Sequence, residues 1–371
     1  ILTFHYAHNY GAMLQAYSLV TFLRLKGYEA QIIDYRLPFI YDLYELLDFK
    51  GFFKRYRRRN NVLIALLKSV KNFSKHKNKS QKWYRFEDFL DNSLIKTSRV
   101  YSSEEINTLN FDCIVCGSDQ IWNGSLTGQL EPLYFCEGLT APNKISYAAS
   151  NGNEKVEMNE WELFKNYISN FSKVSVREKG LADFLRSKGI ANTVVLDPVF
   201  LLDKQVWQGV CNSVPVKRYL LTYSFNENPE FFVEAKKLAD KKHFQLVCFL
   251  FKRNESLSAD IIQIVNGGPK EFVSYFNEAS FVVTNSFHGT AFSVLMQKQF
   301  YTVPPLRGRE RVDSLLSVLG LSNRIVSADF DDTAIIDYHV VYDKLNLLRK
   351  KSWNFLTESL SVCCLLYTSP S

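Results

Sequence analysis

The sequence predicts an α/β protein with two doubly wound domains that face each other across a cleft. Its 371 residues suit two domains, and 46% hydrophobic residues are enough for two sizeable cores. Short apolar strands alternate with amphipathic helices, which is typical of parallel sheets covered by helices. The alternation stops once and restarts, with a polar stretch at 203–216 between the two parts. The predicted domains therefore cover residues 1–205 and 216–341.

The N-terminal part opens with a strand, a helix and a second strand. Residues 1–4 are apolar, and Ala16, Leu19, Val20 and Leu23 recur at helical spacing before Gly27 ends the helix. Residues 30–34 are the second predicted strand. After a basic segment, with expected helices at 62–70 and 83–90, further strands are predicted at 111–116, 144–149, 173–176 and 193–196.

The C-terminal part repeats the pattern. Its predicted strands are 219–223, 244–251, 281–284 and 300–303. Its predicted helices are 230–241, 270–279, 290–297 and 311–319, and a long helix at 342–362 closes the fold. Residues 363–371 break from this pattern and resemble translated adapter sequence, so we expect a non-native tail. The chain starts inside an apolar run, so its native start is expected to lie further upstream.

Ligands of doubly wound sheets bind at the carboxyl ends of strands. This rule selects the loops 9–11, 117–123, 150–152 and 286–289. The candidate binding residues of the first two loops are Asn9, Gly11, Gly117 and Ser118. The loop 117–123 also contains Asp119 and a Trp, and its polar density suits a site. A turn closed by an Asx hydrogen bond, with the Trp in the core, is the alternative.

The tetrad Ser286-Phe287-His288-Gly289 lies between a predicted buried strand and a predicted helix. Backbone N–H groups at a helix N-terminus attract anions such as phosphate. His288 could donate a proton there or bind an anionic ligand, with Ser286 and Gly289 beside it. The alternative is that His288 only caps the helix.

Arginines provide a second set of candidates. Arg177 directly follows the predicted strand 173–176, where its guanidinium could bind a carboxylate or phosphate in bidentate fashion. An ion pair with Glu178 or another acid is the alternative. The cluster Arg307, Arg309 and Arg311 allows the same two interpretations, and at least one member is expected to be a surface charge.

The basic charge is concentrated in one segment. Residues 50–85 hold 13 Lys or Arg and no acid, whereas the rest of the chain holds 32 basic and 38 acidic residues. Aromatic residues interleave with these charges, so the segment could bind nucleic acid, contact an anionic membrane surface, or be a solvated helical excursion. No nucleic-acid motif accompanies the charge, so no nucleic-acid partner is expected.

The remaining motifs mostly exclude functions. There is no G-x-G-x-x-G, Walker A, H-E-x-x-H or G-x-S-x-G pattern, which argues against dinucleotide oxidoreductases, P-loop NTPases and the common hydrolases. Cys113 and Cys116 have redox-motif spacing but fall in a predicted strand, so their side chains point to opposite faces. The cysteines form no disulfide framework, which fits a reducing compartment.

Six stretches resemble the polysaccharide pyruvyl transferase family. In chain order they are HNYGAMLQAYSL (8–19), CGSDQIWN (116–123), SYAAS (146–150), SVRE (175–178), LDPVFLL (196–202) and VTNSFHGTAFS (283–293). The resemblance implies a GT-B-like fold of two Rossmann-like domains and phosphoenolpyruvate as donor, with no other cofactor and no metal. It also implies that Arg177 and His288 belong to the donor site, joined by an Arg of the second domain.

The implied reaction forms a pyruvate ketal on a sugar of a glycan or lipid-linked glycan precursor in the cytoplasm. His288 is then expected to be the general acid and Asp119 the base for the sugar hydroxyl. The basic segment at 50–85 would contact the inner face of the cell membrane. Two alternatives stay open: a nucleotide-sugar glycosyltransferase on the same fold, and a non-catalytic member that acts as a scaffold in a capsule assembly complex.

Overall fold

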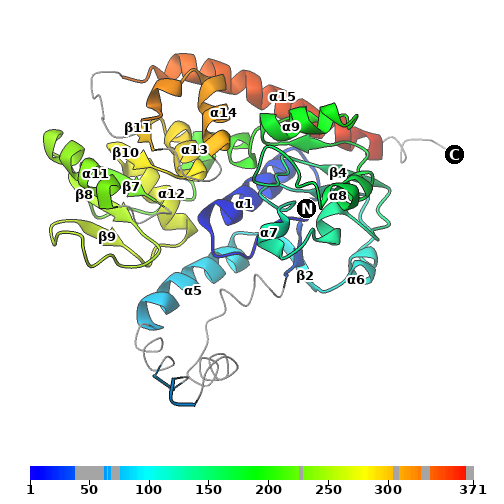
Figure 1. Ribbon diagram of the computed structural model, residues 1–371, viewed down its shortest axis with the longest axis horizontal. Coiled ribbons are helices and arrows are strands. Elements are labelled where there is room, and N and C mark those ends of the chain that lie inside the picture. Colours follow the sequence, from blue (N-terminus) through cyan, green and yellow to red (C-terminus); the bar gives the residue numbers. More distant parts are fainter. Residues whose placement is uncertain are drawn as a thin grey trace.

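A computed structural model describes residues 1–37, 62–64, 66–67, 76–224, 229–303, 309–326 and 335–364. Figure 1 shows two α/β halves with the long last helix lying over both. The elements of the N-terminal half are α1 (Tyr10–Leu25), β1 (Ile32–Tyr35), α5 (His76–Asn92), β2 (Lys96–Val100), α6 (Ser103–Asn107), β3 (Cys113–Cys116), α7 (Gly124–Thr127), β4 (Asn143–Ser146), α8 (Trp161–Ile168), β5 (Ser175–Val176), α9 (Lys179–Ser187), β6 (Thr193–Val194) and α10 (Lys204–Gln208), with 3-10 helices η1 (Pro132–Phe135) and η2 (Pro198–Leu201).

The N-terminal strands form one parallel sheet. The pairs β1–β2, β3–β4 and β5–β6 are all parallel. The first two residues join them, because Ile33 donates its N–H to Ile1 O at 2.8 Å and Leu2 donates to Val115 O at 2.9 Å. A parallel bridge between Ile145 and Lys173 connects β4 to β5. The resulting order is β2, β1, residues 1–2, β3, β4, β5, β6. The first strand of the chain therefore lies in the middle of the sheet, as in a Rossmann fold.

The C-terminal half repeats this order in a second parallel sheet. Its strands lie in the order β11-β10-β7-β8-β9. The elements are β7 (Tyr219–Tyr223), α11 (Pro229–Lys241), β8 (Gln245–Phe249), β9 (Ile262–Ile264), α12 (Pro269–Glu278), β10 (Phe281–Thr284), α13 (Phe287–Leu295), β11 (Gln299–Thr302), α14 (Arg309–Leu319), η3 (Ser322–Arg324) and α15 (Tyr338–Cys364). The predicted fold class of two doubly wound, Rossmann-like domains is therefore confirmed.

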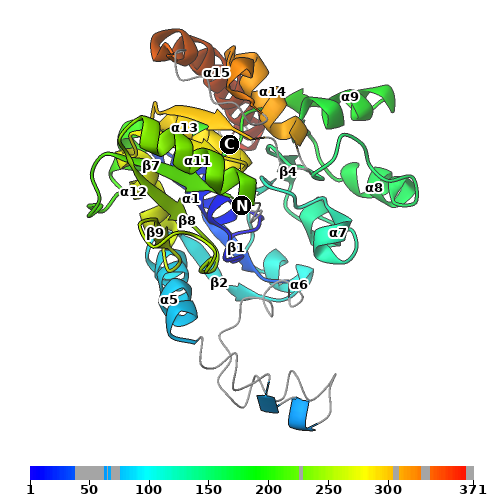
Figure 2. The same cartoon turned by 60° about the vertical axis from the view of Figure 1, so that its left-hand side comes forward.

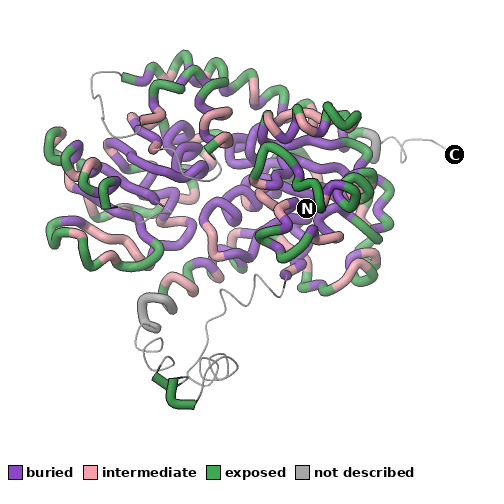
Figure 3. The backbone as a smooth tube through the Cα atoms, viewed as in Figure 1, coloured by how far each residue is buried: buried purple, intermediate pink, exposed green. Residues whose placement is uncertain are grey.

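Helices cover both faces of the second sheet, which explains why its strands are apolar on both sides. Leu220 of β7 packs in a cluster with Phe232 and Leu238 of α11, and Figure 2 shows α11 lying over β7 and β8. The neighbouring Leu221 joins the other cluster, with Phe272 of α12. Figure 3 shows the central strands of both halves buried.

The two halves meet along the carboxyl ends of their strands. Tyr10, at the start of α1, donates its hydroxyl to Gly267 O at 2.9 Å and stacks on Phe272 with ring centroids 5.0 Å apart. Helix α15 then returns to the N-terminal half, where the buried Arg349 guanidinium donates to the carbonyls of Phe200 and Leu202. These contacts give the GT-B-like arrangement expected from the resemblance, and they bring the loops of both sheets together.

Several predicted elements differ from the structure. The prediction missed β2 because this strand is largely exposed and polar, and it missed α8 and α9 in the N-terminal half. The predicted helix at 290–297 was wrong at its start, because α13 already begins at Phe287. The predicted helix at 83–90 is part of the longer α5.

Most of the basic segment and the expected tail lie outside the described residues, so the prediction of a membrane contact stays a prediction. Within the described part of the chain, no helix has the length and apolar character needed to cross a membrane.

Candidate active site between the two sheets

His288 lies in the first turn of α13. Ser286 is the N-cap of this helix, and its Oγ accepts the Gly289 N–H at 3.4 Å. A Cβ at Gly289 would lie 2.2 Å from Thr284 Oγ1, so only glycine allows the turn to pack this closely on β10. Ser286 and Gly289 therefore build the turn, and the cap that was the alternative role for His288 is provided by Ser286.

The His288 ring spans the seam between the two halves. On one side it faces Gly11 of α1, where a Cβ would lie only 2.0 Å from His288 Nδ1. On the other side His288 Nε2 lies 3.7 Å from Asp197 Oδ2, which is an ion-pair distance but too long for a hydrogen bond. The residue is buried, with 8% of its surface exposed. Residues of the N-terminal half thus surround a histidine supplied by the C-terminal half.

Arg177 follows β5 and is buried among carboxylates. Its Nη1 donates to Asp197 Oδ2 at 2.6 Å and its Nε donates to Glu178 Oε1 at 3.1 Å. Asp119 Oδ1 lies 3.8 Å from Arg177 Nη2. Burial opposes the charged form, but Glu178, Asp197 and Asp119 hold the pKa of Arg177 above its usual value. The ion pair with Glu178, which was the alternative interpretation, is present. It leaves Arg177 Nη2 without a hydrogen bond among the described residues.

Of the three arginines after β11, the structure brings Arg311 to Arg177. Both guanidinium groups lie over the ring of Phe287, with centroid distances of 4.8 Å for Arg177 and 5.9 Å for Arg311. Arg309 is instead an exposed side chain paired with Asp313 at 3.0 Å, as expected for a surface charge. Arg307 lies outside the described residues.

Helix α14 is held against the N-terminal half at its first turn. Glu310 Oε1 accepts the N–H of Gly180, in the first turn of α9, at 2.9 Å. Burial raises the pKa of Glu310, while the Gly180 N–H opposes that rise. The contact fixes the end of α14 that carries Arg311, so it helps to orient Arg311 toward Arg177.

Three buried side-chain nitrogens of this region have no hydrogen bond to any described residue. Arg177 Nη2, Arg311 Nε and His288 Nε2 make no hydrogen bond within the described structure. Burial lowers the pKa of Arg311, and the like charge of Arg177 lowers it further. Unpaired buried donors are rare in native proteins, so a cluster of three calls for an explanation such as a ligand.

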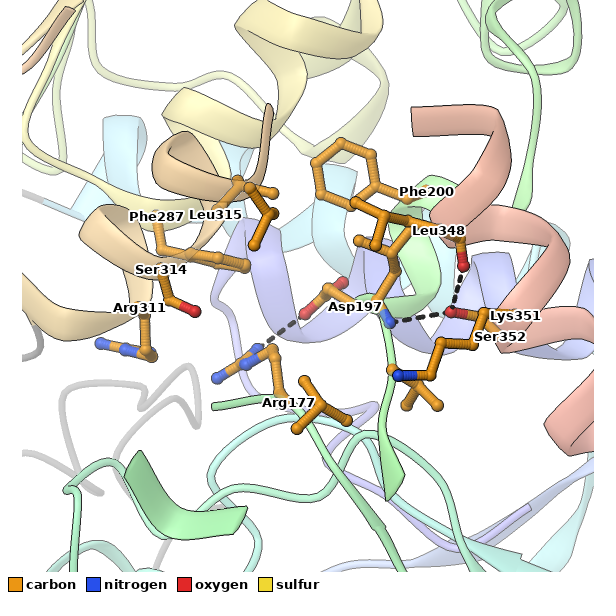
Figure 4. A pocket seen from close by; sticks show the side chains of 14 residues that line it. Arg177, Asp197, Phe200, Phe287, Arg311, Ser314, Leu315, Leu348, Lys351 and Ser352 are labelled. Atoms are coloured by element: carbon orange, nitrogen blue, oxygen red, sulfur yellow. Dashed lines mark hydrogen bonds and ion pairs between the residues drawn. The ribbon is translucent and has the colours of Figure 1, made fainter. Parts of the chain in front are cut away.

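A cavity of about 80 Å³ opens beside this cluster. Both guanidinium groups and Asp197 line it together with Phe287, and the carboxyl-terminal helices α14 and α15 complete its wall (Figure 4). Lys351 of α15 adds a further positive charge to the lining. The arrangement therefore suits a small anionic ligand held between the two halves.

The other predicted residues lie near this cluster but serve the fold. Asn9 caps α1 through a bond from Ala12 N to its Oδ1. Ser118 is fully buried, and its Oγ donates to Ala148 O at 3.0 Å. Gly117 has φ +126°, and a Cβ there would lie 2.2 Å from Tyr147 O. Asp119 remains beside Arg177, and its side chain is 14% exposed.

Sequence reasoning missed Asp197 and Phe287 as members of the site. Asp197 was named in the sequence only within the stretch LDPVFLL, although this residue follows the predicted strand 193–196, and the same rule had selected other loops at strand ends. Phe287 was part of the tetrad, but nothing in its spacing indicated that two guanidinium groups lie over its ring. The described residues contain no group of three or more His, Cys, Asp or Glu placed to hold a metal ion.

Comparison with known proteins gives one family match. A family model described as polysaccharide pyruvyl transferase matches residues 9–305. No curated protein matches significantly. Solved structures that align include a putative UDP-N-acetylglucosamine 2-epimerase from Listeria monocytogenes, with 11% identity, 93% of this chain and 86% of that chain covered, and a TM-score of 0.48. Arabidopsis thaliana UGT89C1 complexed with quercetin aligns with 11% identity, 98% of each chain and a TM-score of 0.45.

Proposed function

The chain belongs to the polysaccharide pyruvyl transferase family, and we propose that it transfers the pyruvyl group of phosphoenolpyruvate to two hydroxyls of one sugar in a glycan precursor. The observation that carries this proposal is the set of buried nitrogens on Arg177, Arg311 and His288 that make no hydrogen bond within the described structure. These groups come from both halves of the molecule, and the two arginines line a cavity of about 80 Å³.

The charge of the donor fits this cluster. Phosphoenolpyruvate carries a carboxylate and a phosphate, which together hold about three negative charges near neutral pH, and guanidinium groups bind both kinds of anion. A buried donor without a partner costs about 1–3 kcal/mol. Binding an anion to Arg177 Nη2 and Arg311 Nε removes that cost, so the apo geometry favours the anionic ligand.

The reaction needs a proton at the donor methylene. In the first step His288 gives its proton to that carbon, and one sugar hydroxyl adds to the central carbon of the donor, with its own proton passing to a base. Asp119, the partly exposed carboxylate beside Arg177, is our candidate for this base. In the second step the neighbouring hydroxyl displaces phosphate from the same carbon, and its proton goes to the departing phosphate. The products are the cyclic pyruvate ketal and inorganic phosphate.

Thermal melting with candidate donors tests the proposal. A ligand that binds only the native state stabilises it by about 2.7 kcal/mol at 100 times its Kd. Phosphoenolpyruvate is therefore expected to raise Tm, and UDP-sugars are expected to do so less. If a UDP-sugar raises Tm and millimolar phosphoenolpyruvate does not, the nucleotide-sugar alternative is favoured and the proposal is wrong.

Substitution of His288 separates an enzyme from a non-catalytic scaffold. His288→Gln removes the general acid, and such losses lower rates about 10²–10⁴-fold. The expected result is a large fall in kcat with phosphoenolpyruvate binding retained. His339→Gln, on the exposed side of α15, is the matched control and is expected to turn over normally. Equal rates for both variants would show that His288 has no part in the chemistry.

A further inference from the structure

Asp197 stands at the start of the LDPVFLL stretch, to which the proposed reaction has so far assigned no role. Its side chain is buried, and both of its carboxylate oxygens accept hydrogen bonds. Oδ1 accepts the Val199 N–H at 3.1 Å, which starts η2. Oδ2 accepts from Arg177 Nη1 at 2.6 Å and lies 3.7 Å from His288 Nε2. One carboxylate thus stands between the two donor-site groups that come from different halves of the molecule.

The groups around His288 make the position of the Asp197 carboxylate unusual. On the α1 side, Gly11 lies close against the ring. Phe287, the neighbour of His288 in the chain, lies under the guanidinium groups of Arg177 and Arg311. The carboxylates of Asp119 and Glu178 contact Arg177. Among the described acids, Asp197 is the one within ion-pair distance of His288.

We propose that Asp197 is the positioning residue of the transfer reaction: its carboxylate favours the protonated form of His288 and orients the imidazole across the seam. The inference rests on the proposed function, because it assigns His288 the role of proton donor. An acid catalyst has to carry its proton when the donor binds, and a neighbouring anion favours the charged imidazole. The Asp197 carboxylate is such an anion, 3.7 Å from His288 Nε2.

Asp197 is able to hold this charge over a wide pH range. Burial would raise the pKa of its carboxyl group, but His288 and Arg177 together hold that pKa well below its usual range. The backbone donor at Oδ1 favours the same ionised form. The carboxylate therefore stays negative throughout the pH range in which histidines titrate.

Asp197→Asn tests the proposal, because the amide keeps the shape and the bond to the Val199 N–H but removes the charge. The expected result is a fall in kcat that is larger at high pH than at low pH, so that the alkaline limb of the pH–rate profile moves to lower pH. A residue with a merely structural role would lower kcat by the same factor at every pH. The KM for phosphoenolpyruvate is expected to change less than kcat, since Arg177 and Arg311 are still present.

Asp203→Asn is the matched control. Asp203 also pairs with an arginine, Arg349, at 3.0 Å, and it directly follows the same short stretch. It makes none of the contacts described for His288, so its substitution is expected to leave the pH–rate profile in place. A shift of equal size in both variants would overturn the assignment to Asp197.

Imidazole NMR decides the question without turnover. In protein labelled with nitrogen-15 histidine, the His288 signals are identified by their loss in His288→Gln. Asp197→Asn is expected to lose the imidazolium signals of His288 at a lower pH than the wild type does, because the fixed anion near Nε2 is gone. A neutral wild-type imidazole near pH 7 would overturn the proposal even if Asp197→Asn does not fold. Failure of phosphoenolpyruvate transfer with the expected titration would instead refute only the proposed function.

Discussion

Arg311→Met is predicted to make the protein more stable and the donor site weaker. The guanidinium of Arg311 is buried beside Arg177, its Nε has no acceptor within the described structure, and its pKa is lowered by burial and by the like charge. Methionine fills similar space and needs no partner. The same change removes one of the cations that we assign to the donor, so stability and binding are expected to move in opposite directions.

The size of both effects follows from the contacts. An unpaired buried donor costs about 1–3 kcal/mol, and the lost contact with the Phe287 ring offsets about 0.5–1 kcal/mol of that gain. The net stabilisation without ligand is therefore about 1 kcal/mol. A hydrogen bond to a charged group contributes about 1.5–3 kcal/mol, so the Kd for phosphoenolpyruvate is expected to rise about 10- to 150-fold.

Thermal melting measures both effects in one experiment. At 100 times the wild-type Kd, phosphoenolpyruvate stabilises the wild type by about 2.7 kcal/mol, whereas a variant with 30-fold weaker binding gains only about 0.9 kcal/mol. Arg309→Met is the matched control. Arg309 lies two positions before Arg311 and is an exposed partner of Asp313. Such pairs contribute about 0–1 kcal/mol, and its ligand response is expected to match the wild type.

Two results would refute this reasoning. If Arg311→Met and Arg309→Met respond equally to phosphoenolpyruvate, Arg311 does not bind the donor. If Arg311→Met lowers Tm in the absence of ligand, the guanidinium has a favourable partner in the free protein, and the unpaired cluster is not the basis of anion binding.

Two further predictions follow from close contacts and burial. Gly11→Ala places a Cβ 2.0 Å from His288 Nδ1, so the ring has to move. We expect kcat to fall about 10²-fold, which is the effect of a displaced catalytic group. Unchanged turnover in a steady-state assay would contradict the position of the ring. Burial lowers the pKa of Lys82 from 10.5 to about 8, so the unfolded chain binds more protons between these values and stability rises with pH there. Lys82→Met is expected to raise Tm at pH 7 and to flatten this rise, and a variant whose Tm follows the wild type at every pH would contradict it.

The sequence was most informative about buried elements. The predicted bounds of β7 and β10 agree with the structure, because both strands are apolar on both faces and are bounded by polar residues. Strand β2 was missed because it is an edge strand whose middle residues are exposed, so it lacks an apolar pattern. The early start of α13 follows from Ser286, whose side chain caps the helix four residues before the predicted start at 290.

The choice among the arginines was beyond the sequence for a geometric reason. Residues two apart on a helix lie about 200° apart around its axis, so Arg309 and Arg311 face opposite sides of α14. Which of them faces Arg177 depends on the phase of the helix, and that phase is fixed by tertiary contacts such as Glu310 with Gly180. The role of Asp197 is hidden for a similar reason, because its partners His288 and Arg177 are distant in the sequence and meet only when the two halves pack together.

The central claim, transfer of a pyruvyl group, is tested most directly by following the central carbon of isotopically labelled phosphoenolpyruvate. The protein is incubated with this donor and a pool of nucleotide-linked and lipid-linked glycan precursors, and the carbon is observed by NMR while released phosphate is measured. We expect a ketal carbon signal on a glycan, equal release of inorganic phosphate, and loss of both in His288→Gln. Label that stays in phosphoenolpyruvate while a UDP-sugar is consumed by the same glycans would contradict it.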